Sequence, residues 1–394
     1  MKAQQAPNAL AAQELRLSHM QIARAFKDPL EHFAIQRLGV NLTQSFTLLE
    51  NSEPFETNAL LRYQVLDAIF SSPDRMSAGE QDSNELTYSE QVITYASLRG
   101  DIPNNAVAMD EVEMWKEGAL ALSQAMGPHD ADPKKAQFKR KYITFSTAAY
   151  KGRDALVELC AGKVDTHRAL GFFISQLVFS CSNEETSYTG YPLEIYSCSW
   201  EKGETTLKKR TFPAFERDTA AQLLLFIEQL YLAIYSAPTP VYLSLFDSII
   251  PGKRNSESKP IVDSVTPSLF NEILRGLVRI NESSSEADKA LLSQLRMTID
   301  EICPFVDKDD APSEEKDEKV QQIVGHAAAL FDSVELQRAL TDWQQTSGQF
   351  SADIANNPYL NWLFPQGVSW NDVPHLSAFI LLAMVNNASR EEKL

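Results

Sequence analysis

The chain has 394 residues, of which 44% are hydrophobic and 23% are charged, and its formal net charge is −17. This composition is typical of a globular protein with a sizeable core. It excludes a protein that wraps nucleic acid over its whole surface, because phosphate binding needs clustered positive charge. The four cysteines form no C-x-x-C pair, so neither a zinc site nor a disulfide framework is predicted.

No segment has the pattern of a secretory signal or of a membrane-spanning helix. The N-terminal residues lack a long apolar core after Lys2. The most apolar predicted helix is interrupted by Glu228 and Gln229. We therefore expect a cytoplasmic protein without membrane contacts.

A pair of helices is predicted near the start of the chain. Ser18 and Gln21 have the spacing of a capping box, which starts a helix. Asp28 and Pro29 end this helix and start another, with Asp28 as its N-cap. Gly39 is expected to end the second helix in a left-handed conformation. The apolar face of the second helix is predicted to comprise Leu30, Phe33, Ala34 and Leu38.

Helical periodicity continues until residue 126 and then changes. Helices are predicted at Asn58–Phe70 and Ala108–Met126, with a polar loop between them. The β-rich runs that follow are residues 139–150, 154–160, 191–200 and 205–212. Helices are predicted at residues 165–180 and 219–235, between and after the strand pairs. This order predicts a mixed α/β (α+β) fold with a small sheet flanked by helices.

The composition shifts after residue 250. Residues 251–260 are linker-like, and residues 307–319 form an acidic charge run that is expected to be disordered. Helices are predicted at Ser268–Ile280 and Val320–Thr346. The predicted division is a flexible segment 1–16, a domain 17–250 and a helical C-terminal region 251–394.

Several segments follow one another in an order that is typical of a known family. They are "LSHMQIARAFKDPLEHFAIQRLGVNL" (17–42), "SEPFETNALLRYQVLDAIF" (52–70), "GDIP" (100–103), "RALGFFISQLVFS" (168–180), "FPAFERDTAAQLLLFIEQLYLAIYSAPTPVY" (212–242), "ALTDWQQTSGQF" (339–350) and "NPYLNWLFPQG" (357–367). In this order they resemble the nuclease-like C-terminal domain of RecC, the gamma subunit of exodeoxyribonuclease V (the RecBCD helicase–nuclease). The chain departs from the family at "NNAVAMDE" after "GDIP", where the family tends to carry glycines, and in residues 247–319, which are expanded and acidic. Because a complete subunit is much longer, the chain is expected to be a fragment, a split-gene product or a diverged stand-alone copy.

The resemblance implies the PD-(D/E)XK nuclease fold, whose chemistry needs carboxylates on adjacent strands and a lysine two residues after the second one. In this chain the corresponding strand has Glu158, but the position two residues later is Cys160, and the nearest lysine is Lys163. The preceding strand contains no acidic residue. Asp28 stands where related nucleases carry an iron–sulfur cysteine. The expectation is therefore a degenerate nuclease-like core without catalytic residues, metal or cofactor.

The remaining polar residues give weaker signals. The six histidines have no metal-like spacing, so each is expected to be a surface or core residue. A basic cluster stands out in the acidic chain and comprises Lys134, Lys135, Phe138, Lys139, Arg140 and Lys141. It is either a DNA phosphate contact with Phe138 stacking on a base, or a solvated strand edge protected by lysines.

The leading functional hypothesis is a non-catalytic RecC-type subunit or fragment that acts in assembly and DNA binding during double-strand break repair by homologous recombination. The resemblance implies RecB-type helicase–nuclease and RecD-type helicase partners, which would use ATP and Mg²⁺, and double-stranded DNA ends. One alternative is a stand-alone Mg²⁺ nuclease that uses Glu158 with Asp154 or Asp165. Another is a generic helical interaction module. The sequence does not divide four apolar residues between core and interface, namely Phe33, Leu38, Trp362 and Phe364.

Overall fold

The computed structural model describes residues 15–42, 88–100, 102, 105–130, 132–182, 190–201, 204–241, 243, 357–366 and 374–394. Four predicted features lie outside the described residues, namely the helices at Asn58–Phe70, Ser268–Ile280 and Val320–Thr346 and the acidic run 307–319.

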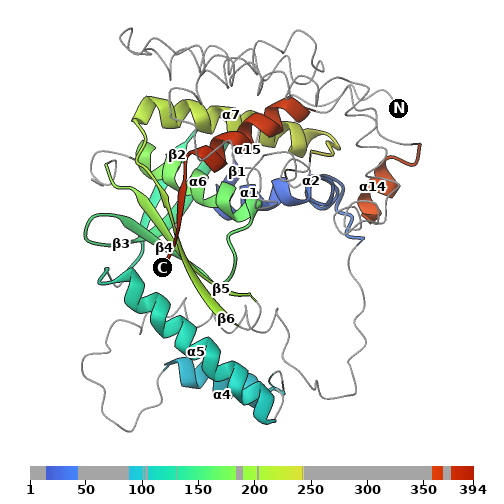
Figure 1. Ribbon diagram of the computed structural model, residues 1–394. Helices are drawn as coiled ribbons and strands as arrows, with labels where there is room; N and C mark the ends of the chain where they lie inside the picture. The colour runs from blue at the N-terminus through green and yellow to red at the C-terminus, as the bar shows by residue number, and fades with distance from the viewer. Residues whose placement is uncertain are drawn as a thin grey trace, which may run out of the picture.

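A mixed seven-stranded sheet forms the centre of the described structure (Figure 1). Its strands are β1 (Leu15–Ser18), β2 (Lys134–Lys139), β3 (Ile143–Lys151), β4 (Leu156–Cys160), β5 (Leu193–Glu201), β6 (Glu204–Phe212) and β7 (Arg390–Lys393). The strand order is β1-β3-β4-β5-β6-β7, and β2 pairs with β3. The β1–β3 and β4–β5 pairs are parallel, whereas the other pairs are antiparallel.

The mixed α/β prediction is confirmed, but the prediction of a small sheet is wrong. The four central strands match the predicted β-rich runs. The sequence analysis missed β1, β2 and β7. β1 and β7 have four residues each, which is too short for a period-two pattern, and β2 carries three lysines that hide its alternation. These three strands are stabilised by pairing with β3 and β6 rather than by their own composition.

Four helices lie on one side of the sheet (Figure 1), namely α1 (His19–Lys27), α6 (Thr166–Cys181), α7 (Arg217–Ser236) and α15 (His375–Asn387). α1 and α6 pack on the strands, and α7 and α15 pack on α6. α6 lies at their centre and is buried over nearly its whole length. Gly171 on α6 allows α1 to approach closely, since a Cβ atom there would lie 2.7 Å from Met20 Sδ. The main hydrophobic core lies between this helical layer and the sheet.

The opposite face of the sheet carries α5 (Ala106–Met126), which lies beside α4 (Tyr88–Leu98) in Figure 1. Asn105 caps α5 by accepting a hydrogen bond from the Ala108 N–H. Trp115 and Leu122 of α5 are buried in a second core, together with Tyr196 of β5. The predicted helix ending at Met126 is therefore confirmed.

The capped helix pair at the start of the chain is confirmed. Ser18 and Gln21 form the predicted capping box, with hydrogen bonds of 2.8 and 3.2 Å. Asp28 caps α2 (Pro29–Phe33) through the Glu31 N–H. Gly39 has φ 66°, as predicted.

The apolar face predicted for the second helix is wrong at Leu38. Leu30, Phe33 and Ala34 are buried, but Leu38 is 48% exposed. The chain changes from α2 to a π-helix, η2 (Ala34–Leu38). A π-helix has more residues per turn than an α-helix, so Leu38 no longer lies under the preceding turns. Of the other three apolar residues that the sequence left open, Phe33 is buried, Phe364 packs against a small cluster around Leu30, and Trp362 is 45% exposed.

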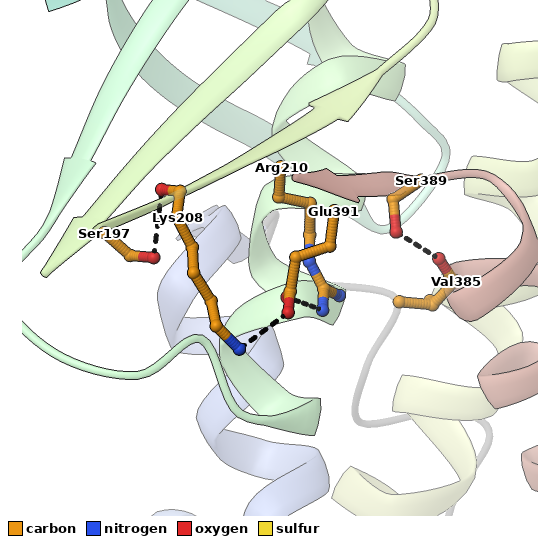
Figure 2. Close-up of polar contacts among 6 residues, drawn as sticks. All are labelled: Ser197, Lys208, Arg210, Val385, Ser389 and Glu391. Atoms are coloured by element: carbon orange, nitrogen blue, oxygen red, sulfur yellow. Dashed lines mark hydrogen bonds and ion pairs between the residues drawn. The ribbon is translucent and has the colours of Figure 1, made fainter. Parts of the chain in front are cut away.

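The described C-terminal segments pack onto the domain formed by earlier residues. α14 (Pro358–Leu363) contacts α2, and its N-cap Asn357 donates a hydrogen bond of 2.8 Å to Asp28 Oδ2. α15 contributes to the main core, and β7 extends the sheet. Glu391 of β7 bridges Lys208 and Arg210 of β6, at 3.0 and 2.7 Å (Figure 2).

Glu228 of α7 connects the helical layer to the start of β3. Its Oε1 atom accepts hydrogen bonds of 3.0 Å from the backbone N–H groups of Tyr142 and Ile143. Arg140 Nε lies 3.8 Å from its Oε2 atom. α7 is long and apolar enough by composition to span a bilayer, but half of its most apolar stretch is buried in the domain. Glu228 is thus a polar anchor within a core helix.

We expect replacement of Glu228 by Leu to destabilise the fold by about 3 kcal/mol, because two backbone donors would lose their acceptor and Arg140 its counter-charge. Glu228→Gln should cost less, since an amide oxygen can still accept hydrogen bonds. Urea denaturation of both variants and of the exposed control Glu216→Gln measures these differences. A Leu variant as stable as the Gln variant would show that these hydrogen bonds contribute nothing.

Candidate functional site

Glu158, where the sequence analysis placed the expected nuclease motif, lies beneath the helical layer. Residues alternate between the two faces of a strand, so Glu158 shares one face of β4 with Leu156 and Cys160, which belong to the main core. This face is covered by α6 and α1, as the contacts of Glu158 with Ser175 and His19 show. The side chains of Glu158 and His19 are each 11% exposed.

Three polar side chains lie near the Glu158 carboxyl group. Ser175 of α6 donates a hydrogen bond of 2.6 Å to Glu158 Oε1. The hydroxyl groups of Ser175 and Thr147 lie 2.6 Å apart, and Thr147 comes from β3. His19 of α1 places its Nε2 atom 3.7 Å from Glu158 Oε2. The strand beside β4 thus presents a hydroxyl group to this site rather than a carboxylate.

Burial makes both titratable groups of this site prefer their neutral forms. Desolvation raises the pKa of Glu158 from 4.5 to about 7, against the hydrogen bond from Ser175, which lowers it. Desolvation also lowers the pKa of His19 from 6.5 to about 4, and the backbone of Ser146 opposes this shift. A neutral carboxyl group is a poor ligand for Mg²⁺, because hard cations bind ionised carboxylates.

Cys160 occupies the position where a catalytic lysine was expected, and it contacts Arg168. Cys160 is buried, and its Sγ atom accepts a hydrogen bond of 3.5 Å from Arg168 Nη1. The same Arg168 atom donates to the Lys163 carbonyl oxygen at 3.0 Å. Lys163 itself is exposed beyond the end of β4. Arg168 thus joins the end of β4 to the loop that follows it through hydrogen bonds.

The two carboxylates considered for a rival metal site lie apart from this arrangement. Asp165 is the N-cap of α6, accepts a hydrogen bond from the Arg168 N–H, and lies 2.8 Å from His167 Nδ1. Asp154 is exposed in the turn before β4. Within the described ranges, no group of three His, Cys, Asp or Glu residues is arranged to hold a metal ion.

The residues of the basic cluster differ in their partners and in the face of the sheet on which they lie. Lys134 forms an ion pair of 2.8 Å with Asp130, Arg140 lies beside Glu228, and the Lys141 ammonium group lies 4.9 Å from the centre of the Tyr142 ring. Phe138 packs against the main core. Lys135 and Lys139 are exposed on β2. Whether any of these residues contacts DNA stays a prediction.

Three polar residues near Glu158 were not predicted as site residues from the sequence. His19, Thr147 and Ser175 come from three elements, and each has an ordinary local role in helix or strand. The clearest signal was Ser175, which with Gln176 interrupts an apolar run of α6. A buried hydroxyl group needs a hydrogen-bond partner, but the sequence does not say which one.

A family model described as RecC C-terminal domain matches residues 14–245 of the chain. The matched range contains β1 to β6 and the helices α1, α6 and α7, and therefore every residue of the Glu158 site. A comparison with curated proteins finds no match.

The neutral preference of Glu158 predicts a pH effect. Its pKa is higher in the folded state than the ordinary 4.5, so its contribution to stability is complete below pH 4.5 and is lost as the pH rises through about 7. Wild type should therefore lose ~3 kcal/mol relative to Glu158→Gln between pH 4.5 and pH 8. His19 acts in the opposite direction, since its contribution is lost as the pH falls from 6.5 through about 4, and it cancels in this comparison.

Urea denaturation of wild type and Glu158→Gln across this pH range measures the effect. Glu216→Gln, at an exposed carboxylate, is the matched control and should follow wild type. Parallel pH profiles for wild type and Glu158→Gln would contradict the prediction.

Proposed function

The chain belongs to the RecC C-terminal domain family, and we propose from this membership that it is a non-catalytic RecC-type subunit, or a fragment of one, in an exodeoxyribonuclease V (RecBCD) complex. Its role would be assembly and DNA binding in double-strand break repair by homologous recombination. Its partners would be RecB-type helicase–nuclease and RecD-type helicase subunits, in the cytoplasm. ATP and Mg²⁺ would be used by these partners, and the chain itself would carry no cofactor.

The environment of Glu158 is the observation that most supports a non-catalytic role. Phosphodiester hydrolysis by two-carboxylate sites needs ionised groups that hold Mg²⁺ near the phosphate. Here the carboxyl group is buried and bonded to Ser175, and burial raises its pKa from 4.5 to about 7, so that a large fraction is protonated near neutral pH. Thr147 stands beside it where the neighbouring strand would have to supply a second carboxylate. These features fit a nuclease-like core whose catalytic position has become part of the core packing.

Two exposed apolar side chains support a role in assembly. Leu38 of η2 is 48% exposed and Trp362 of α14 is 45% exposed. η2 continues directly from α2 along the chain, and α14 contacts α2. Exposed large apolar residues such as these are enriched at contacts between proteins, where tryptophan often contributes strongly. The seven-stranded sheet does not fit the alternative of a generic helical module.

The assembly role predicts that the chain co-purifies with the RecB-type and RecD-type subunits encoded in the same genome. Binding to the folded form alone should raise its melting temperature, because a partner at a hundred times its dissociation constant adds about 2.7 kcal/mol to the free energy of unfolding. Size-exclusion chromatography and thermal denaturation, with and without the partners, measure both effects. A chain that stays monomeric beside these subunits would show that the assembly role is wrong.

The non-catalytic role predicts that the purified chain does not cleave linear DNA in the presence of Mg²⁺. Glu158→Ala should leave this result unchanged, and Asp165→Asn is the control at the other carboxylate considered for a metal site. Electrophoresis of end-labelled DNA is the measurement. Mg²⁺-dependent cleavage that disappears in Glu158→Ala would instead establish the stand-alone nuclease.

A further inference from the structure

The register of the sheet brings basic residues from distant parts of the sequence onto one surface. Arg16 of β1 pairs with Thr144 of β3 from one side, and Lys139 of β2 pairs with the same Thr144 from the other side. Lys135 of β2 pairs with Ala148 of β3. Residues that pair across strands lie on the same face of a sheet. Arg16, Lys135 and Lys139 therefore share one face of β1-β3-β2, which we call the outer basic face.

This face points away from the helical layer. The neighbours of the basic residues along the strands, namely Leu15, Leu17, Ala136, Phe138, Ile143 and Phe145, all belong to the main core or pack against it. Alternate residues point to opposite faces, so Arg16, Lys135 and Lys139 lie on the far side, and all three are exposed. Among the described elements, α5 covers β5 and β6 on this side of the sheet and leaves these three side chains accessible.

Three further cations of the basic cluster lie beside partners away from this face. Lys134 pairs with Asp130, and Arg140 lies beside the buried Glu228. Lys141 lies over the Tyr142 ring. The outer basic face is thus smaller than the cluster in the sequence, but it gains Arg16, which is more than a hundred positions away from Lys135.

We propose that the outer basic face binds the phosphate backbone of double-stranded DNA. Two strand spacings separate Arg16 from Lys139, which is about 10 Å, and four residues separate Lys135 from Lys139, which is about 13 Å along an extended strand. One strand of duplex DNA carries a charge about every 3.4 Å of helix axis, so a face of this size spans several phosphates. Gln137 lies between the two lysines and is exposed, with an amide group that can also donate to phosphate.

Duplex DNA suits this surface better than an acidic protein segment does. The three cations are spread over a sheet face, and contacts to a phosphate backbone need only positive charge at suitable spacing. The whole chain has a net charge of −17, which repels DNA, so a contact with DNA requires a local group of positive charges. This inference rests on the proposed function, since a RecC-type subunit works at a DNA end.

The test is the salt dependence of DNA affinity in the assembled complex, with blunt-ended duplexes of two unrelated sequences as probes. Log affinity falls as log salt rises, and each lost phosphate contact reduces the magnitude of this negative slope by about 0.9. Lys135→Gln/Lys139→Gln should lower the slope by about two units, and adding Arg16→Gln should lower it by about one more, equally for both duplexes. Lys135→Arg/Lys139→Arg should retain the wild-type slope, because it retains both charges.

The matched control is Arg24→Gln/Lys27→Gln, which removes two exposed charges from α1 on the helical side of the sheet. An unchanged slope in the triple variant, or an equal decrease in the control, would overturn the proposal. Co-purification of each variant with the partner subunits is measured in parallel. Normal assembly with an unchanged slope would reject only the outer basic face, whereas a wild-type chain that does not assemble would reject the proposed function. If the wild-type chain does not assemble, the DNA affinity of the same variants is measured with the full chain alone at low salt, and it tests whether the outer basic face binds DNA.

Discussion

The complete burial of α6 is the constraint on which the rest of the structure depends. The helix packs on the sheet and is covered by α1, α7 and α15, so its polar side chains cannot reach solvent. Each of them therefore needs a partner inside the protein. Ser180 accepts a hydrogen bond from the Phe215 N–H, Gln176 donates to the Tyr191 carbonyl oxygen, and Ser175 bonds to Glu158 and Thr147. The packing of α6 on the sheet therefore also supplies the hydrogen-bond partner of Glu158.

The same burial explains how a carboxyl group is accommodated beneath α6. An isolated charge beneath α6 would be costly, but a protonated carboxyl group bonded to Ser175 is not. Glu228 shows the other solution, because two backbone N–H groups and Arg140 surround its carboxylate at the start of β3. The first carboxyl group is accommodated by losing its charge and the second by acquiring donors, and both hold the helical layer on the sheet.

The charge distribution separates the two faces of the β1-β3-β2 part of the sheet. One face is apolar and carries the helices, and the other carries Arg16, Lys135 and Lys139. Lysines on β2 also protect an edge strand from pairing with other chains. The interpretation of the cluster as a protected strand edge and its interpretation as a DNA contact are therefore compatible. Arg16 lies on β1, which is another edge strand of the described sheet, so the same two interpretations apply to it.

The sequence by itself determined the local features of this protein. The capping box at Ser18, the Asp28-Pro29 corner, the left-handed Gly39 and the limits of α6 and α7 all follow from interactions within a few residues. Only the tertiary structure decided what depends on pairing across the chain. The short strands β1 and β7 exist because β3 and β6 offer them partners, and Leu38 is exposed because a π-helix replaces the expected α-helix. Glu158 contacts His19 and Ser175, and Ser175 contacts Thr147, through packing between elements. Arg16 and Lys139 share a face because both pair with Thr144. Residue order along the chain does not encode these relations locally.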